Sequence, residues 1–317
     1  MKERGTISIS MSIGIVLLVA ALVIGILFYI SWNPKESLDK RVCHTSVILR
    51  GSAPVGTEII KLTCKTEKVC ITAKKGEECE KGATYDSVIK VKDEEELKKE
   101  LIILMGECWW MMGEGKVDYR SKGFYSYTYC GICDLVTFDK SIQENIGISQ
   151  INYRDLLESM EKTKLKDVDS ESIPYKDESF LRYFFNVDSS QKVYDALVKA
   201  AEENGVTANL NNVYLTPSQK YVLVTAMMKT GSWGEVLGGG YLGGAIIAIP
   251  VILFGVLTGG IGIVGVAIIG GGTAIGGSIG WWYSEADRNY IQPMFLEESS
   301  KALGKDGLEC EEWDILP

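Results

Sequence analysis

The segment GFYSYTYCGICDLVTFD, residues 123–139, alternates aromatic and polar side chains and ends in an apolar run. A period of two, with many aromatic and β-branched residues, predicts a β-strand. This strand would carry the CxxC pair Cys130 and Cys133. Because strand-like residues flank the pair on both sides, structural disulfides are favoured over the redox site of thioredoxin-like proteins, which lies at a helix N-terminus.

A helix is predicted immediately before this strand, in KDEEELKKELIILMGECWWMMGEG, residues 92–115. Asp93 can start it, Glu94 and Lys98 form an i,i+4 pair, and Gly113 can end it. Its second half is apolar on nearly every side, which favours burial of Trp109–Met112 in a core, with an exposed docking patch as the alternative.

Further short elements surround these two. The predicted strands are 57–66 and 68–74, expected to pair with each other, 85–92 and 219–229, and the predicted helices are 152–163 and 190–203. The sequence therefore predicts an α+β domain over residues 33–236.

Two apolar segments flank this domain. Residues 12–32 carry no charge over about the twenty residues that a bilayer-spanning helix needs, which predicts a transmembrane helix after a cytoplasmic segment 1–11. A cleaved secretory signal is the alternative, although no small-x-small cleavage site follows. The N-terminal segment, Arg4-Gly5 followed by TISISMSIGIVLLVAALVIGIL, resembles the class III, prepilin-type signal of archaeal type IV pilin-like proteins. The resemblance implies an archaeal, surface-exposed protein; Ser10 stands where that signal usually has an acidic residue.

The second apolar segment has no charged residue from Leu237 to Tyr283. One helix of that length would measure about 70 Å, over twice the hydrocarbon thickness of a bilayer. The sequence thus predicts a hairpin of two transmembrane helices, 237–257 and 261–282, with a turn at 258–260 that includes Gly259. The tail 283–317 would then return to the outer side and pack on the exported domain.

Small and aromatic residues fit this hairpin. Pairs of small residues four apart let helices approach closely in lipid, and Trp side chains favour membrane interfaces. The expected helix-packing residues are Gly240, Gly244, Gly255, Gly259, Gly272, Gly276 and Gly280, and the expected interface belt is Trp32, Trp233, Trp281 and Trp282.

The eight cysteines lie outside the apolar segments. An exported domain tends to form disulfides, and the hairpin would place the last cysteine in the same compartment as the others. The expected disulfide residues are Cys43, Cys64, Cys70, Cys79, Cys108, Cys130, Cys133 and Cys310, with the pairing left open and buried free thiols as the alternative.

Other motifs point to no catalytic site, metal or cofactor. His44 adjoins Cys43, but sequence neighbours seldom face each other, and an oxidised Cys43 would not be a nucleophile. A zinc site would need ligands that the CxxC pair lacks, and residues 167–172 lack the glycine and distal glutamate of a calcium loop. The net charge of −9 argues against nucleic acid as a partner.

The sequence predicts an α+β, disulfide-braced exported domain with three transmembrane helices, in a multi-pass protein of the cell membrane. The expected function is cell-surface binding, adhesion or envelope organisation without catalysis, with the lipid bilayer and either an unknown protein or further copies of the chain as partners. The alternatives are an oligomeric pore built from the glycine-rich hairpin and a membrane-tethered thiol oxidoreductase acting through Cys130 and Cys133.

Overall fold

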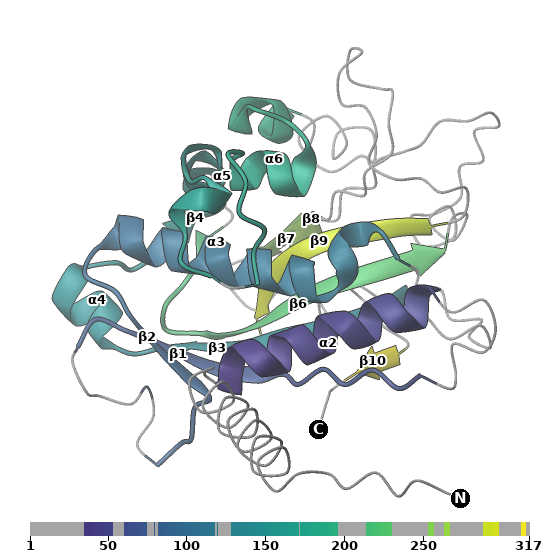
Figure 1. Ribbon diagram of the computed structural model, residues 1–317. Helices are drawn as coiled ribbons and strands as arrows, with labels where there is room; N and C mark the ends of the chain where they lie inside the picture. The colour runs from purple at the N-terminus through teal and green to yellow at the C-terminus, as the bar shows by residue number, and fades with distance from the viewer. Residues whose placement is uncertain are drawn as a thin grey trace, which may run out of the picture. The chain divides into compact units, whose positions relative to one another are not determined.

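The chain divides into two units, Met1–Asp39 and Lys40–Pro317, and the second carries the fold described below. The computed structural model describes residues 35–52, 60–74, 79, 82–117, 119, 128–170, 172–195, 214–229, 253–256, 263–266, 288–297 and 312–314. Helix α2 spans Lys35–Ser52, and its residues from Lys40 onward belong to the second unit. The described elements of this unit form an α+β fold (Figure 1).

Six described strands form the main sheet. Its order is β2 (Ser87–Lys90), β1 (Glu67–Thr72), β3 (Thr128–Phe138), β6 (Lys220–Lys229) and β9 (Arg288–Glu297), and β10 (Glu312–Asp314) also pairs with β3. Strand β3 runs parallel to β1 and β10 and antiparallel to β6, so the sheet is mixed.

Strand β6 lies in the interior of this sheet, between β3 and β9. Every residue from Tyr221 to Met227 is buried, so both faces of the strand are covered. A strand covered on both faces can be apolar continuously instead of at every second residue. This explains why apolar residues follow one another in the middle of β6, with Thr225 as the one polar residue between Tyr221 and Met227.

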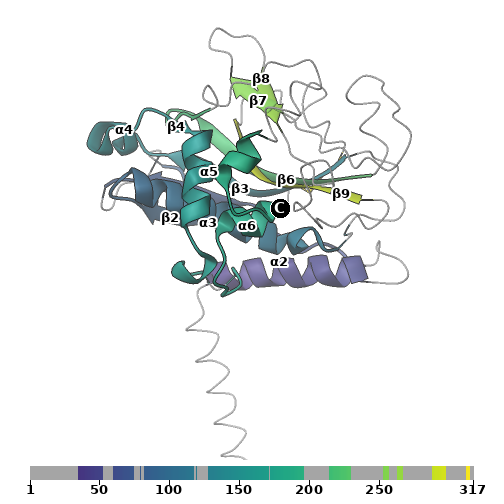
Figure 2. The same cartoon turned by 90° about the horizontal axis from the view of Figure 1, so that it is seen from above.

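Helix α3 (Glu94–Met111) crosses one face of the sheet (Figures 1 and 2). The carboxylate of Asp93 accepts a hydrogen bond from Glu96 N at 2.8 Å and starts the helix, and Glu96 accepts one from Lys92 N. Helices α5 (Tyr153–Lys162) and α6 (Phe180–Phe185) pack against α3. The apolar side chains between α3, these helices and the sheet form the core.

The contact between α3 and α6 depends on Gly106. A Cβ at this position would lie 2.6 Å from Cε1 of the buried Phe180 and 3.0 Å from Cδ1 of Ile173. We expect Gly106→Ala to lower the free energy of unfolding by about 1–3 kcal/mol, because overpacking a close-packed core forces side chains off their rotamers. Urea unfolding would measure the change.

Gly131→Ala is the matched control for this prediction. Its Cβ would also make a close contact, 2.7 Å from Cε of Met112, but that atom ends a flexible side chain that can move aside. We expect a smaller loss of stability than for Gly106→Ala. Equal losses would contradict the assignment of the strain to the Phe180 ring.

The remaining described elements are short. They comprise α4 (Ser141–Ile146), the 3-10 turns η2 (Gly113–Gly115) and η3 (Leu165–Asp167), the pair β4 (Ile151–Asn152) and β5 (Tyr214–Leu215), and the pair β7 (Leu253–Val256) and β8 (Ile263–Val266). None of these strands belongs to the main sheet.

Several sequence predictions are confirmed. The strand predicted in 123–139 is β3, the helix predicted after Asp93 is α3, and the helix predicted in 152–163 is α5, capped by Asn152. Trp109, Met111 and Met112 are buried, which confirms the core assignment for them. The strands predicted in 85–92 and 219–229 are β2 and β6, and residues 190–195 are helical.

The predicted pairing of strands 57–66 and 68–74 is wrong. Residues 61–66 form no strand, and β1 pairs instead with β2 and β3, both in parallel. The two apolar runs are close in sequence, which favoured a hairpin between them. In the structure β1 lies inside a larger sheet, where β2 and β3 from later in the chain are its neighbours.

The three transmembrane helices are also corrected. Among the described residues, no helix combines the length and the apolar character needed to cross a membrane. Residues 253–256 and 263–266, predicted inside the two helical arms, are the antiparallel strands β7 and β8. Isoleucine, valine and glycine are weak helix formers, so a long apolar run built from them does not by itself specify helix. The same finding contradicts the predicted multi-pass location in the cell membrane.

Most residues assigned to the membrane segments lie outside the described residues. Gly255 lies in β7. The others, Trp32, Trp233, Gly240, Gly244, Gly259, Gly272, Gly276, Gly280, Trp281 and Trp282, are not described, nor is the N-terminal segment that resembles pilin-like proteins. That resemblance remains a prediction.

Candidate functional site

The CxxC pair lies within β3. Cys133 forms a disulfide with Cys108 of α3, with a Cα–Cα distance of 5.6 Å, so the two cysteines of the motif are not bonded to each other. Both Cys108 and Cys133 are buried in the core. Between Ile132 and Asp134 the register of β3 against β6 shifts, which places Cys133 at an irregularity of the strand. The disulfide therefore fixes α3 to the centre of the sheet.

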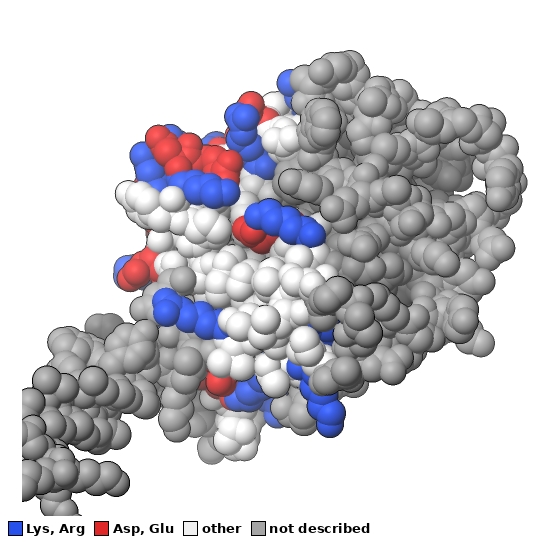
Figure 3. Space-filling model, turned by 45° about the vertical axis from the view of Figure 1, so that its right-hand side comes forward, with Lys and Arg blue, Asp and Glu red and all other residues white. Residues whose placement is uncertain are grey.

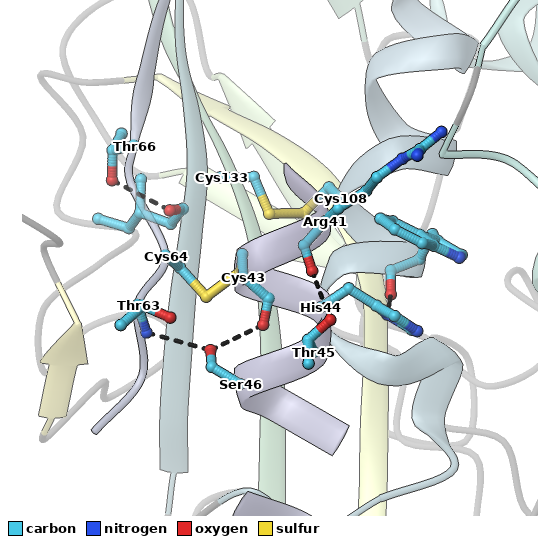
Figure 4. The surroundings of a disulfide bond; sticks show 12 residues. Arg41, Cys43, His44, Thr45, Ser46, Thr63, Cys64, Thr66, Cys108 and Cys133 are labelled. Carbon is cyan, nitrogen blue, oxygen red and sulfur yellow. Dashed lines mark hydrogen bonds between the residues drawn. A yellow bond between two sulfur atoms is a disulfide. The ribbon is translucent and has the colours of Figure 1, made fainter. Parts of the chain in front are cut away.

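A second disulfide joins Cys43 of α2 to Cys64, which precedes β1 (Figure 4). Ser46 lies one turn further along α2, where its Oγ donates to Cys43 O at 2.7 Å and accepts from Thr63 N at 3.1 Å. Helix α2 is thus attached to the chain before β1 by a covalent bond and by this hydrogen-bond bridge.

A third disulfide joins Cys70 of β1 to Cys79, which lies beyond the end of the strand. Cys79 Sγ is 3.2 Å from Thr137 O of β3. The three disulfides of described residues therefore all involve the region of β1 and β3, and there is no free thiol in the described part of the chain.

Cys130, the first cysteine of the motif, is also disulfide-bonded. The three pairs above use six of the eight cysteines, and β10 brings Trp313 opposite Cys130 in the sheet. We therefore predict that Cys310, which precedes β10 and lies outside the described residues, is the partner of Cys130. Mass spectrometry of a non-reducing digest should find peptides joined by these two residues. Alkylation of Cys310 without reductant, or a link between two chains through it, would contradict the prediction.

The same region holds a buried cluster of charges around Lys40 of α2. Its Nζ lies 2.7 Å from Glu107 Oε2 of α3 and 3.3 Å from Glu67 Oε2 of β1. The second oxygen of Glu107 accepts a hydrogen bond from Ser170 Oγ at 2.7 Å. Burial lowers the pKa of Lys40, but the charges of Glu107, Glu67 and Asp134 outweigh this effect and raise the pKa well above its ordinary value. Lys40 is therefore charged across the physiological range.

Two of these carboxylates belong to neighbouring strands. Glu67 of β1 is the Cα partner of Asp134 of β3, and both side chains are buried. Like charges opposite each other in a sheet destabilise it, and a buried carboxylate costs several kcal/mol of solvation unless a cation or hydrogen bonds compensate. Lys40 supplies positive charge at this point, so the cluster is a structural link between α2, α3 and the sheet.

His44, which follows the cysteine of α2, faces α3. Its ring stacks on Trp110 with the centroids 4.0 Å apart, and its Nδ1 lies 2.6 Å from Trp110 O. Because a carbonyl oxygen only accepts, Nδ1 carries the hydrogen in this bond. Cys43 is held in its disulfide, so these residues form no nucleophile pair.

The described residues include no group of three or more His, Cys, Asp or Glu side chains placed to hold a metal ion. Within residues 167–172, which carry the oxygen-rich side chains of a calcium loop, Ser170 Oγ donates a hydrogen bond to Glu107. The sequence matches no family model, and comparison with curated proteins and with solved structures finds no similar chain.

The Lys40 cluster was missed by sequence reasoning. Its members come from four elements that are distant in the chain, and none stands in a recognisable motif. A signal existed at one point: Glu107 is a lone charge in an otherwise apolar half-helix, which implies a buried partner. The identity of that partner depends on the packing of α2, a helix that the sequence analysis did not predict.

Proposed function

We propose that the protein is a binding protein without catalytic activity that works in an oxidising environment. The disposition of the CxxC motif carries this proposal. A thiol oxidoreductase needs an accessible pair of cysteines that can bond to each other, whereas Cys133 is buried and bonded to Cys108 of another element. The disulfides support an oxidising environment, since they are rare where thiols are kept reduced.

The other chemically versatile side chains support the same proposal. Lys40 is engaged by carboxylates in the interior, and His44 is fixed against Trp110. Figure 3 shows one face of the molecule, on which the described charged side chains stand in small groups of both signs around a broad uncharged area. Depletion of charge is typical of the central part of surfaces that contact other proteins. Adhesion or organisation of an envelope are roles that such a binding protein would serve.

Single cysteine replacements test the proposal against the oxidoreductase alternative. In Cys133→Ser and Cys130→Ser, an enzyme that exchanges disulfides with client proteins would accumulate mixed disulfides. Cys70→Ser, which opens a disulfide outside the motif, is the matched control. We expect each of the three variants to lose about 2–5 kcal/mol of stability, as is typical when a structural disulfide is removed. We expect all three to form equally few mixed disulfides with client proteins.

Two outcomes would contradict the proposal. One is trapping of client proteins by Cys133→Ser or Cys130→Ser but not by Cys70→Ser. The other concerns the environment: in cells quenched directly with acid and then treated with an alkylating reagent, we expect the cysteines to be protected until reductant is added. Full alkylation without reductant would show that the protein resides in a reducing compartment.

A further inference from the structure

The disulfide between Cys70 and Cys79 differs from the others in its accessibility. Cys79 is half-buried, whereas every other cysteine of the described residues is at most 7% exposed. It lies beyond the end of β1, and only nine positions separate it from Cys70. A thiolate of a reducing molecule must reach one of the two sulfur atoms to open a disulfide. Among the described cysteines, Cys79 is therefore the one at which such an attack can start in the folded protein.

The other two disulfides of described residues hold separate elements together in the interior. Cys108–Cys133 joins α3 to β3, and both residues belong to the core. Cys43–Cys64 joins α2 to the chain before β1, and both residues are buried. A reductant reaches such bonds only after the elements around them open. Their reduction therefore requires at least partial unfolding.

The folded structure also accommodates the two thiols that reduction of Cys70–Cys79 produces. Cys79 Sγ lies 3.2 Å from Thr137 O and 3.9 Å from Ile71 O, so a thiol at this position has a hydrogen-bond acceptor. Cys70 is fully buried in β1, where a thiol packs as a small apolar side chain. Thr137 is the partner of Cys70 across the two strands, and this backbone pairing does not depend on the disulfide. The sheet can thus stay intact in the reduced protein.

We propose that Cys70–Cys79 is a redox switch, which a dithiol reductant opens while the rest of the protein stays folded. One thiolate of the reductant attacks Cys79 Sγ, the bond to Cys70 breaks, and the Cys70 sulfur takes up a proton. The second thiol of the reductant then attacks the first, and Cys79 leaves as a thiol. The reductant becomes a disulfide and gives two electrons to the protein, and its oxidised form closes the switch by the reverse steps. The proposal does not rest on the proposed binding function.

The switch changes how the chain after β1 is held. In the oxidised protein the disulfide fixes this chain to the strand. Ala73 N and Lys74 N, which follow the strand, donate to Ser141 Oγ at 2.9 Å and to Thr72 Oγ1 at 3.2 Å. Reduction removes the covalent restraint and leaves weaker, non-covalent contacts. We expect hydrogen exchange at these two amides to become faster in the reduced protein, and exchange in the ladder between β1 and β3 to stay unchanged.

Reduction followed by alkylation tests the proposal on the native chain. The protein is treated with dithiothreitol, thiols are trapped with an alkylating reagent at increasing times, and mass spectrometry identifies the labelled cysteines. We expect Cys70 and Cys79 to be labelled together, at least about tenfold faster than the cysteines of the two buried disulfides, in protein that is still folded by circular dichroism. Release of all three pairs at one rate, earlier release of a buried pair, or no release before unfolding would overturn the proposal.

Urea below the unfolding transition separates the two routes of reduction. Direct attack on Cys79 needs no opening of the fold, so urea should leave the rate for this disulfide nearly unchanged. Reduction of Cys108–Cys133 depends on partial unfolding and should become faster. Gly106→Ala, which destabilises the core, should act in the same way as urea, and Gly131→Ala should have a smaller effect. Equal acceleration of both disulfides would show that Cys70–Cys79 also opens only by unfolding, and would contradict the switch.

Discussion

Lys40→Met is expected to lower the free energy of unfolding by about 3–5 kcal/mol, as removal of one partner of a buried ion pair does. The substitution leaves Glu67 and Glu107 in the interior without the ammonium group that lies 3.3 and 2.7 Å from them. The loss comes from carboxylates that have given up their water and lose the charge of the Lys40 ammonium group, which offsets part of that cost. Urea unfolding at neutral pH, followed by circular dichroism, would measure it.

Lys164→Met is the control, because Lys164 forms a pair of the same length at the surface. Its Nζ is 2.7 Å from Asp177, but the side chains are 46% and 63% exposed, compared with 6% and 14% for Lys40 and Glu107. We expect a loss below about 1 kcal/mol, since water solvates exposed ions and screens their attraction. Similar losses for the two variants would contradict the structural importance of the Lys40 cluster.

A double variant separates the charge from the packing of the lysine chain. In Lys40→Met/Glu107→Gln, one buried carboxylate becomes a neutral amide of nearly the same shape. If unpaired charge causes the loss, Glu107→Gln should cost less in the Lys40→Met background than in the native protein, by a coupling energy of about 0.5–3 kcal/mol. Strict additivity would show that the loss in Lys40→Met comes from packing alone.

The sequence predicted those elements whose own residues determine their structure. Helix α3 has a capping aspartate, i,i+4 pairs and terminal glycines, and β3 has clear alternation. In contrast, α2 was not predicted, because its sequence is not strongly apolar on one face. Its place is determined by Cys43, Lys40 and His44, whose partners are all distant in the chain.

The error in the apolar segments has a related cause. The length of an uncharged run was used to predict a membrane helix, yet β7 and β8 show that valine, isoleucine and glycine in such a run can pair as strands. Strand β9 was also missed: among the described strands it pairs with β6, which lies far earlier in the sequence. Pairing of distant strands leaves no local signal, so neither the sheet order nor the cluster beside it could be derived from periodicity.

The stability of the protein is expected to fall steeply above about pH 10, because the buried Lys40 and Tyr183 and the half-buried Tyr153 hold their protons in the folded state. The charges around Lys40 raise its pKa from 10.5, burial raises that of Tyr153 from 10.0 to about 12, and burial together with Glu114 raises that of Tyr183. In the unfolded chain these groups release their protons near their ordinary pKa values. Their contribution is therefore complete below about pH 10 and is lost as the pH rises, by about 1.4 kcal/mol per pH unit for each group.

The slope of stability against pH, rather than its value at one pH, identifies the groups responsible. Between pH 11 and 12 the unfolded chain binds about two to three fewer protons at these sites, because Tyr153 itself begins to release its proton near pH 12 in the folded state. The free energy of unfolding should therefore fall by about 3–4 kcal/mol. Tyr183→Phe should reduce that slope by about a third, even though it also removes the hydrogen bond to Glu114 and lowers stability at every pH. Urea unfolding across this pH range, with the disulfides kept intact, would compare Tyr183→Phe with the native protein. An identical slope for the two would show that burial of Tyr183 does not cause the loss of stability at alkaline pH.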